Sequence, residues 1–308
     1  LLAVPTSFDE NTAGLPRMAQ HLEAAPTEAA HAVILSSGAI RQEDELRRGQ
    51  DASYLSLAMQ ALGDRYPALP KWRLFQMGYP GMDSLAAGLD NRSLLGRWPV
   101  LTLVELSEGD RLADPQDVLV GLEGLIRNNG EREPRSWEKP KHLETDFMIL
   151  HSPSQTLVQQ YLDGERPAVV AQHEAIARHY DLPTLNLAAR FAAAVEDGNY
   201  ELDSLYIENG GLSPAGHTLA GEMLAEALSA ALGRAGDLPG SLPTALVPKD
   251  ELLSPTRVAY ERVDYGEGWL DWQESAVPRF YHVLRADGTP GAITVEMKGR
   301  LLAAQVLL

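Results

Sequence analysis

The sequence of 308 residues contains no cysteine, which excludes disulfide bonds and thiolate metal sites. It also contains no HxH or HExxH pattern, so we expect no metal ion and no other cofactor. No apolar run approaches the roughly 20 residues that a membrane-spanning helix needs. The sequence therefore predicts no membrane span.

Basic residues are scarce relative to acidic ones. There are 26 Lys and Arg against 43 Asp and Glu, which gives a formal net charge of −17. This charge argues against nucleic acid or an anionic membrane surface as a partner and is most simply a solubility feature. The chain begins LLAVPTS without a methionine. A targeting segment removed from a secreted or organellar protein would leave such a start, and the compartment stays open.

Strand-like and helix-like segments alternate along the first two thirds of the chain. The apolar, strand-like runs are His31–Leu35, Trp72–Met77, Leu101–Leu106 and Phe147–Leu150. The helical stretches include Ser53–Leu62, Gln116–Arg127, Ala168–His179 and Ala215–Leu232. This alternation predicts an α/β fold, a doubly wound (flavodoxin-like) parallel sheet, in which ligands bind beyond the carboxyl ends of the strands.

The chain changes character after the last of these helices. We expect a main domain at 1–235, a Gly- and Pro-rich linker at 236–256 and a small β-rich C-terminal region at 257–308. Trp269 and Trp272 in that region suggest stacking on a sugar. We favour their burial against the main domain, because large aromatic side chains are usually well buried.

Four sequence blocks occur in the order typical of one enzyme family. They are VILSSGAI at 33–40, FQMGYPGMDS at 75–84, VLTLVELSEGD at 100–110 and ENGGLSPAGHTLAGEMLAEAL at 208–228. Together they resemble the conserved blocks of the SGNH (GDSL-type) hydrolase and esterase family. The resemblance implies the same doubly wound sheet, with a site for an acyl ester or an acylated carbohydrate.

When the family's site residues are matched to this sequence, glycine stands at the positions of the nucleophile and of both oxyanion donors. Gly38 takes the place of the nucleophilic serine. Gly81 matches the oxyanion glycine, a role that needs only a backbone N–H. Gly109 takes the place of the asparagine that donates the other oxyanion hydrogen bond, whereas Asp110 matches the aspartate that follows it. The resemblance therefore implies a site with no nucleophile and half an oxyanion hole.

The last block implies that the base is missing as well. Counting back from the Gly216-His217 pair places Glu208 at the family's aspartate and Gly211 at its histidine. Serine-based acyl transfer needs a nucleophile, an imidazole base and oxyanion donors together. We therefore interpret the chain as a pseudoenzyme that binds a carbohydrate or acyl ligand or acts as a structural subunit of an assembly.

The alternative is an active esterase or deacetylase that acts on acylated carbohydrate or small esters. It would use Ser37 as a shifted nucleophile, with Glu208 or His217 as partner. The competing interpretation is that Ser36 and Ser37 hydrogen-bond the backbone of their turn, as serines after a strand commonly do.

The remaining histidines favour structural roles. His217 lies at a helix start, where a catalytic role is disfavoured because a helix N-terminus lowers the proton affinity of an imidazole. His173 and His179 lie six residues apart on one helix and do not share a face closely, which favours packing or surface positions. His151 ends a strand and is expected at the rim of the cleft.

Overall fold

A computed structural model of the chain describes residues 10–24, 30–37, 53–66, 72–78, 81–89, 99–130, 145–238 and 242–248, and four short strands at 263–265, 269–272, 283–286 and 293–295. The chain divides into two compact units, Leu1–Ser254 and Pro255–Leu308. No helix in the described ranges is long and apolar enough to cross a membrane.

The first unit contains a parallel sheet of five strands in the order β2-β1-β3-β4-β5. The strands are β1 (Ala30–Ser36), β2 (Trp72–Gly78), β3 (Leu101–Glu105), β4 (Asp146–His151) and β5 (Thr184–Asn186). The predicted α/β fold with a parallel sheet is confirmed, and four of the strands match the predicted runs closely. The strand β5 was not predicted, because its three residues are too short to show a periodic pattern.

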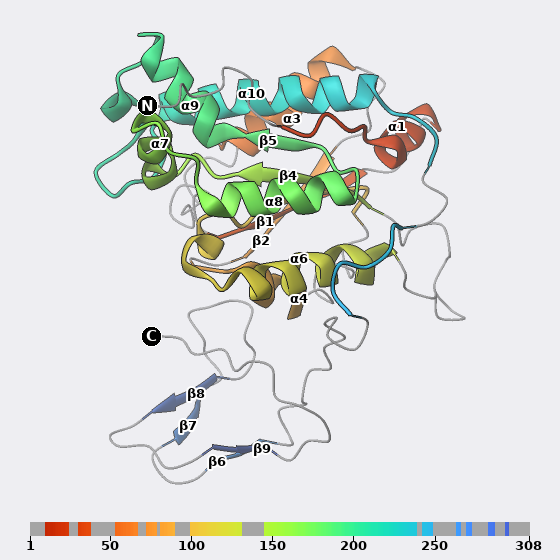
Figure 1. The fold of residues 1–308 in the computed structure, drawn as a ribbon, viewed down its shortest axis with the longest axis vertical. Coiled ribbons are helices and arrows are strands. Elements are labelled where there is room, and N and C mark those ends of the chain that lie inside the picture. The colour runs from red at the N-terminus through yellow and green to blue at the C-terminus, as the bar shows by residue number, and fades with distance from the viewer. Residues whose placement is uncertain are drawn as a thin grey trace. The chain divides into compact units, whose positions relative to one another are not determined.

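Helices cover both faces of this sheet (Figure 1). Besides α3 (Tyr54–Arg65) and α10 (Pro214–Gly233), the described helices are α1 (Pro16–Glu23), α4 (Ser84–Leu89), α6 (Pro115–Gly130), α7 (Gln155–Leu162), α8 (Ala168–His179), α9 (Leu187–Glu196) and the short 3₁₀ helices η2 (Gly109–Leu112) and η4 (Leu202–Leu205). The side-chain period of two in β1 divides the core. Ala32 and Ile34 pack in the cluster with α3 and α10, whereas Val33 and Leu35 pack in the cluster with α4 and α6.

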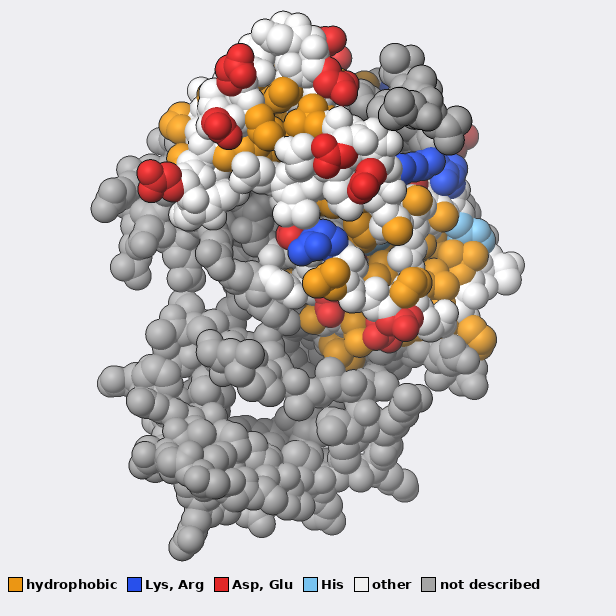
Figure 2. All heavy atoms as spheres, turned by 60° about the vertical axis from the view of Figure 1, so that its left-hand side comes forward, with side chains coloured by type: hydrophobic (Ala, Val, Ile, Leu, Met, Phe, Trp, Pro, Cys, Tyr) orange, Lys and Arg blue, Asp and Glu red, His pale blue; other side chains and the backbone are white. Residues whose placement is uncertain are grey.

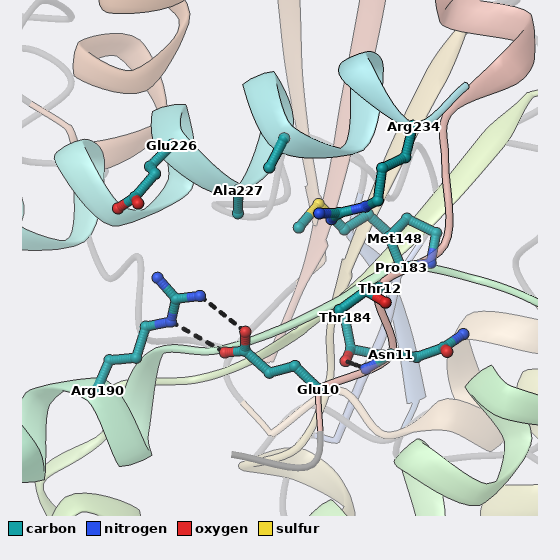
Figure 3. Close-up of a pocket in the computed structure, with 11 residues that line it drawn as sticks. Glu10, Asn11, Thr12, Met148, Pro183, Thr184, Arg190, Glu226, Ala227 and Arg234 are labelled. Carbon is teal, nitrogen blue, oxygen red and sulfur yellow. Dashed lines mark hydrogen bonds and ion pairs between the residues drawn. The ribbon is translucent and has the colours of Figure 1, made fainter. Parts of the chain in front are cut away.

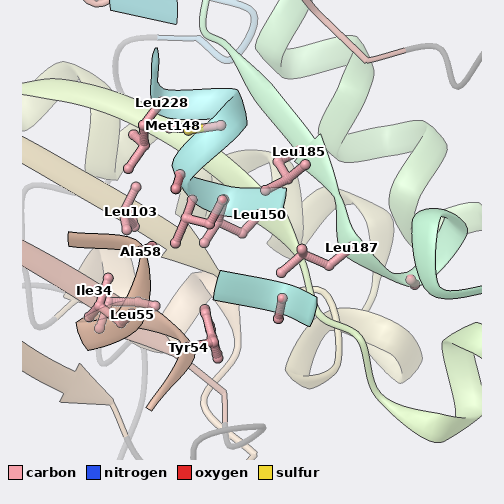
Figure 4. Packing of buried hydrophobic residues seen from close by; sticks show 14 of the residues in the cluster. Ile34, Tyr54, Leu55, Ala58, Leu103, Met148, Leu150, Leu185, Leu187 and Leu228 are labelled. Carbon is pink, nitrogen blue, oxygen red and sulfur yellow. The ribbon is translucent and has the colours of Figure 1, made fainter. Parts of the chain in front are cut away.

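The larger cluster joins α3 and α10 to the middle of the sheet. Figure 4 shows Tyr54 and Ala58 of α3 near Ile34, and Leu228 of α10 near Met148. Serine side chains begin both helices: Ser53 caps α3 and Ser213 caps α10, each accepting a backbone N–H three residues later. In α10, Leu219, Leu224 and Leu228 are buried, whereas Met223 and Ala227 are only partly buried.

Two strand pairs occur in the second unit. The antiparallel pairs are β6 (Val263–Tyr265) with β9 (Ile293–Val295) and β7 (Trp269–Trp272) with β8 (Val283–Ala286). The side chains of Trp269 and Trp272 lie outside what the structure describes, so their role stays a prediction, as does the separate small C-terminal region. Within the predicted linker, residues 242–248 contact α6 and α8 through hydrogen bonds.

Candidate functional site

Backbone hydrogen bonds tie together the segments that follow β1, β2 and β3. The N–H of Ser37 donates to the carbonyl of Glu105 at 3.0 Å, and the N–H of Gly81 donates to the carbonyl of Ser37 at 2.8 Å. Gly81 has a φ of +79°, a conformation that favours glycine. The donor that matches the oxyanion glycine is therefore already engaged inside the fold.

The side chain of Ser37 is enclosed at this junction. Ser37 is 3% exposed, and its Oγ has no hydrogen-bond partner among the described residues. The backbone hydrogen bond suggested for this hydroxyl is thus absent there, as is any hydrogen bond to Glu208 or His217. Pairing of Ser37 with either base remains a prediction, and Gly38 lies outside the described residues.

Gly109 has a packing reason to be glycine. It begins η2, and a Cβ atom built on it would lie 1.9 Å from the carbonyl oxygen of Met82 and 3.0 Å from the Cβ of Ser37. Since real Cβ atoms do not approach backbone oxygen so closely, this position has no room for an asparagine. The backbone of the β3 loop approaches the β2 loop too closely for any side chain.

Asp110 anchors two helices from this loop. It is 3% exposed, and its Oδ1 accepts the backbone N–H of Ser84 at 2.7 Å. Its Oδ2 accepts the Ser84 hydroxyl and lies 2.8 Å from Nε2 of His173. Asp110 therefore joins the end of β3 to the start of α4 and to α8. His173 is fully buried, which agrees with the packing role rather than the surface role.

A second buried histidine–carboxylate pair lies beside the first. Nε2 of His151 is 2.9 Å from Oε1 of Glu174, and the rings of His151 and His173 are 5.7 Å apart. Burial lowers the pKa of His151, which favours the neutral imidazole. His151 is completely buried and does not line an exposed rim. The two pairs make a polar layer beneath the strand ends.

Glu105 is an acidic residue that sequence reasoning missed. It ends β3, is completely buried, and accepts the hydroxyl of Ser36 at 2.7 Å. Burial raises its pKa from 4.5 to about 7, although the hydroxyls of Ser36, Tyr54 and Ser152 oppose the rise. A lone glutamate in the apolar run LTLVEL was the signal available in the sequence.

The last block places its residues in different environments. His217 is 4% exposed; its Nδ1 accepts the N–H of Tyr54 at 3.3 Å, and its ring stacks on that of Tyr54. Glu208 lies exposed in the turn before Gly211. A Cβ atom at Gly211 would meet only movable side-chain atoms, the nearest being Oδ1 of Asn209 at 3.1 Å. Unlike Gly109, this glycine is not required by packing.

Exposed apolar side chains lie on two loops, one after β3 and one after η4. Leu112, at the end of η2, is 84% exposed, and Ile207 is 39% exposed. Their loops are tied to one turn: the Ser154 hydroxyl donates to Glu108 at 2.7 Å, and the Tyr206 hydroxyl donates to the Pro153 carbonyl at 2.8 Å. Figure 2 shows one face of the molecule, on which apolar side chains are exposed among acidic ones.

Two hollows lie away from the three strand-end loops. One, of about 130 Å³, is drawn in Figure 3, where Arg190 binds Glu10 through two hydrogen bonds of 3.0 and 2.7 Å. The other, of about 270 Å³, is lined in part by Arg17, Asp146 and Leu242. Neither contains Ser37 or Gly81. Within the described ranges, no cluster of three or more histidine or acidic side chains is arranged to hold a metal ion.

Comparison with solved structures identifies the fold. Scans of the sequence against protein-family models and against curated proteins give no match. The chain is similar to a two-domain esterase (CEX) active on acetylated mannans and co-crystallized with mannopentaose: the TM-score is 0.68 at 20% identity, over 92% of this chain and 72% of that one. A second structure of a two-domain esterase (CEX) gives a TM-score of 0.69 at 18% identity, over 93% and 74%. The resemblance to SGNH (GDSL-type) esterases is confirmed for the fold.

Proposed function

We propose that this chain is an SGNH-like pseudoenzyme that binds an acylated carbohydrate or another acyl ester beyond the carboxyl ends of its sheet. The observation that carries the proposal is the enclosed junction at Ser37. Its buried hydroxyl has no hydrogen-bond partner within the part of the chain that the structure describes, and the N–H of Gly81 is bonded to its carbonyl.

The chemistry of acyl transfer supports this proposal. A serine reacts when an imidazole within hydrogen-bond reach takes its proton and free donors face the developing oxyanion. Loss of one oxyanion donor typically reduces kcat by about 100- to 1,000-fold. Here Gly109 has no side chain to donate, Gly81 donates elsewhere, and Nδ1 of His217 accepts from Tyr54. Hydrolysis through Ser37 therefore requires rearrangement of several loops.

The proposed ligand class is inferred from the similar fold of CEX and from two exposed apolar side chains of this chain. CEX acts on acetylated mannans. In this chain Leu112 and Ile207 expose apolar surface on loops tied to the Pro153-Ser154 turn. An acyl group on a sugar supplies a small apolar surface that such side chains can cover, and the sugar hydroxyls remain in water.

A fluorophosphonate probe tests the absence of nucleophilic activity. We expect no stoichiometric labelling of the chain, because no described base lies within hydrogen-bond reach of Ser37. Ser37→Ala is compared with Ser152→Ala, since Ser152 is also a buried serine. Labelling of the wild type that survives Ser152→Ala and disappears in Ser37→Ala would establish an active esterase and overturn the pseudoenzyme proposal.

Calorimetric titration with mannopentaose and with an O-acetylated manno-oligosaccharide tests binding. We expect the acetylated ligand to bind more tightly and Leu112→Ser to weaken it by about tenfold, equivalent to about 1.4 kcal/mol. Leu238→Ser is the matched control, because Leu238 is also exposed (41%) but lies beyond α10. If Leu112→Ser and Leu238→Ser bind the ligand with equal affinity, the proposed contact between Leu112 and the acyl group is wrong. No binding, together with a multimeric mass in solution, would favour the assembly subunit instead.

A further inference from the structure

Residues 242–248, with the sequence LPTALVP, form a segment that we call the strap. A single carboxylate, that of Glu123 in α6, holds its main chain. Glu123 is completely buried, and its Oε1 and Oε2 accept the backbone N–H groups of Leu246 and Val247, each at 2.6 Å. A carboxylate with both oxygens bonded to consecutive amides makes strong, charge-assisted hydrogen bonds.

Neighbouring side chains fix this carboxylate and extend the contact. The Tyr180 hydroxyl donates to Oε1 of Glu123 and accepts from Nε of Arg127 at 2.8 Å. Arg127 also donates from Nη2 to the carbonyl of Pro243. Nε2 of His179 lies 2.8 Å from the carbonyl of Thr244. Side chains of α6 and α8 therefore bind four main-chain groups of the strap. These are the carbonyls of Pro243 and Thr244 and the N–H groups of Leu246 and Val247.

Two strap side chains add apolar contact at the ends of this polar contact. Val247 is 1% exposed, and Leu242 packs against the core cluster that contains Ile126 of α6 and Tyr180. Leu246, between them, is 43% exposed. Main-chain hydrogen bonds combined with apolar anchors are the way protein grooves recognise extended peptides.

We propose that the face formed by α6 and α8 is a peptide-binding site occupied by the chain's own strap, with Glu123 as the positioning residue. Docking of the strap holds this part of the chain after α10 against α6 and α8.

Release of the strap leaves Glu123 buried without its two amide donors, which favours the bound state. A buried acceptor that loses its donors stays removed from water without compensation, which is unfavourable. Glu123→Gln keeps the side-chain volume but replaces one acceptor with an NH₂ group that faces a backbone N–H. This variant therefore separates the hydrogen bonds from the packing.

Hydrogen–deuterium exchange of the full chain tests the proposal. In the wild type we expect slow exchange at the Leu246 and Val247 amides, and in Glu123→Gln an increase of about tenfold or more at the strap, with unchanged exchange in β3 and β4. Glu222→Gln, an exposed glutamate on α10, is the matched control. Wild-type strap amides that exchange at the rate of an unstructured peptide would overturn the proposal.

Val247→Ser provides a second route to the same result if Glu123→Gln unfolds the unit. It removes an apolar anchor from the strap and leaves Glu123, Arg127 and Tyr180 in place. We expect faster exchange confined to residues 242–248 in this variant also. Unchanged strap exchange in Val247→Ser would contradict a docked strap, whatever Glu123→Gln does.

Discussion

Two glycines that the sequence places at catalytic positions differ in what their surroundings allow. At Gly109 a Cβ atom would lie 1.9 Å from a carbonyl oxygen of the backbone. At Gly211 the nearest atom to a Cβ is the movable Oδ1 of Asn209, at 3.1 Å. Gly109 is therefore required by the fold, whereas Gly211 lies where a side chain can be accommodated.

Alanine substitution distinguishes these two roles. We expect Gly109→Ala to lower the free energy of unfolding by about 1–3 kcal/mol or more, because the added methyl group forces the β2 and β3 loops apart. Gly211→Ala should change it by no more than about 0.5 kcal/mol, as is usual for surface substitutions. Urea unfolding of both variants provides the measurement. Equal stability of the two would mean that Gly109 is not held by close packing.

At the scale of elements, the Asp110–His173 pair connects the end of β3, the start of α4 and the middle of α8. A double-mutant cycle of Asp110→Asn and His173→Gln should give a coupling energy of about 0.5–3 kcal/mol, the range for residues in one hydrogen-bond network. His179→Gln serves as the control on the same helix, because His179 is only partly buried and bonds the strap instead. Additive effects in the Asp110–His173 cycle would show that the contact does not stabilise the fold.

The sequence predicts the elements of this region better than their contacts. Helix-like stretches indicated α3 and α10, and their alternation with strand-like runs indicated the parallel sheet. His173 and Asp110 are 63 positions apart, and their pairing depends on how α8 packs beside η2. No local pattern carries that information. The enclosure of Ser37 and the buried Glu105 likewise follow from the loops that meet around them.

At the scale of the whole molecule, two buried carboxyl groups make stability depend on pH. Burial raises the pKa of Glu105 from 4.5 to about 7 and that of Asp146 from 3.8 to about 6, the latter against the opposing contacts with Met18 and Arg17. Between the unfolded and folded pKa values the folded chain binds more protons than the unfolded chain. The stability that these two carboxyl groups contribute is therefore fully present below about pH 4. It is lost as the pH rises through about 6 and about 7, the folded pKa values of Asp146 and Glu105.

We expect the thermal unfolding temperature to fall between pH 5 and pH 8, and the net charge of −17 acts in the same direction through self-repulsion. Glu105→Gln should reduce this slope and should be more stable than the wild type at pH 8. A shift from 4.5 to about 7 corresponds to at most about 3 kcal/mol. Differential scanning calorimetry at several pH values measures the slope, with the exposed Glu201→Gln as control. An unchanged slope in Glu105→Gln would show that Glu105 is ionised in the folded protein throughout this range. Its hydrogen bonds at the end of β3 would then outweigh its burial.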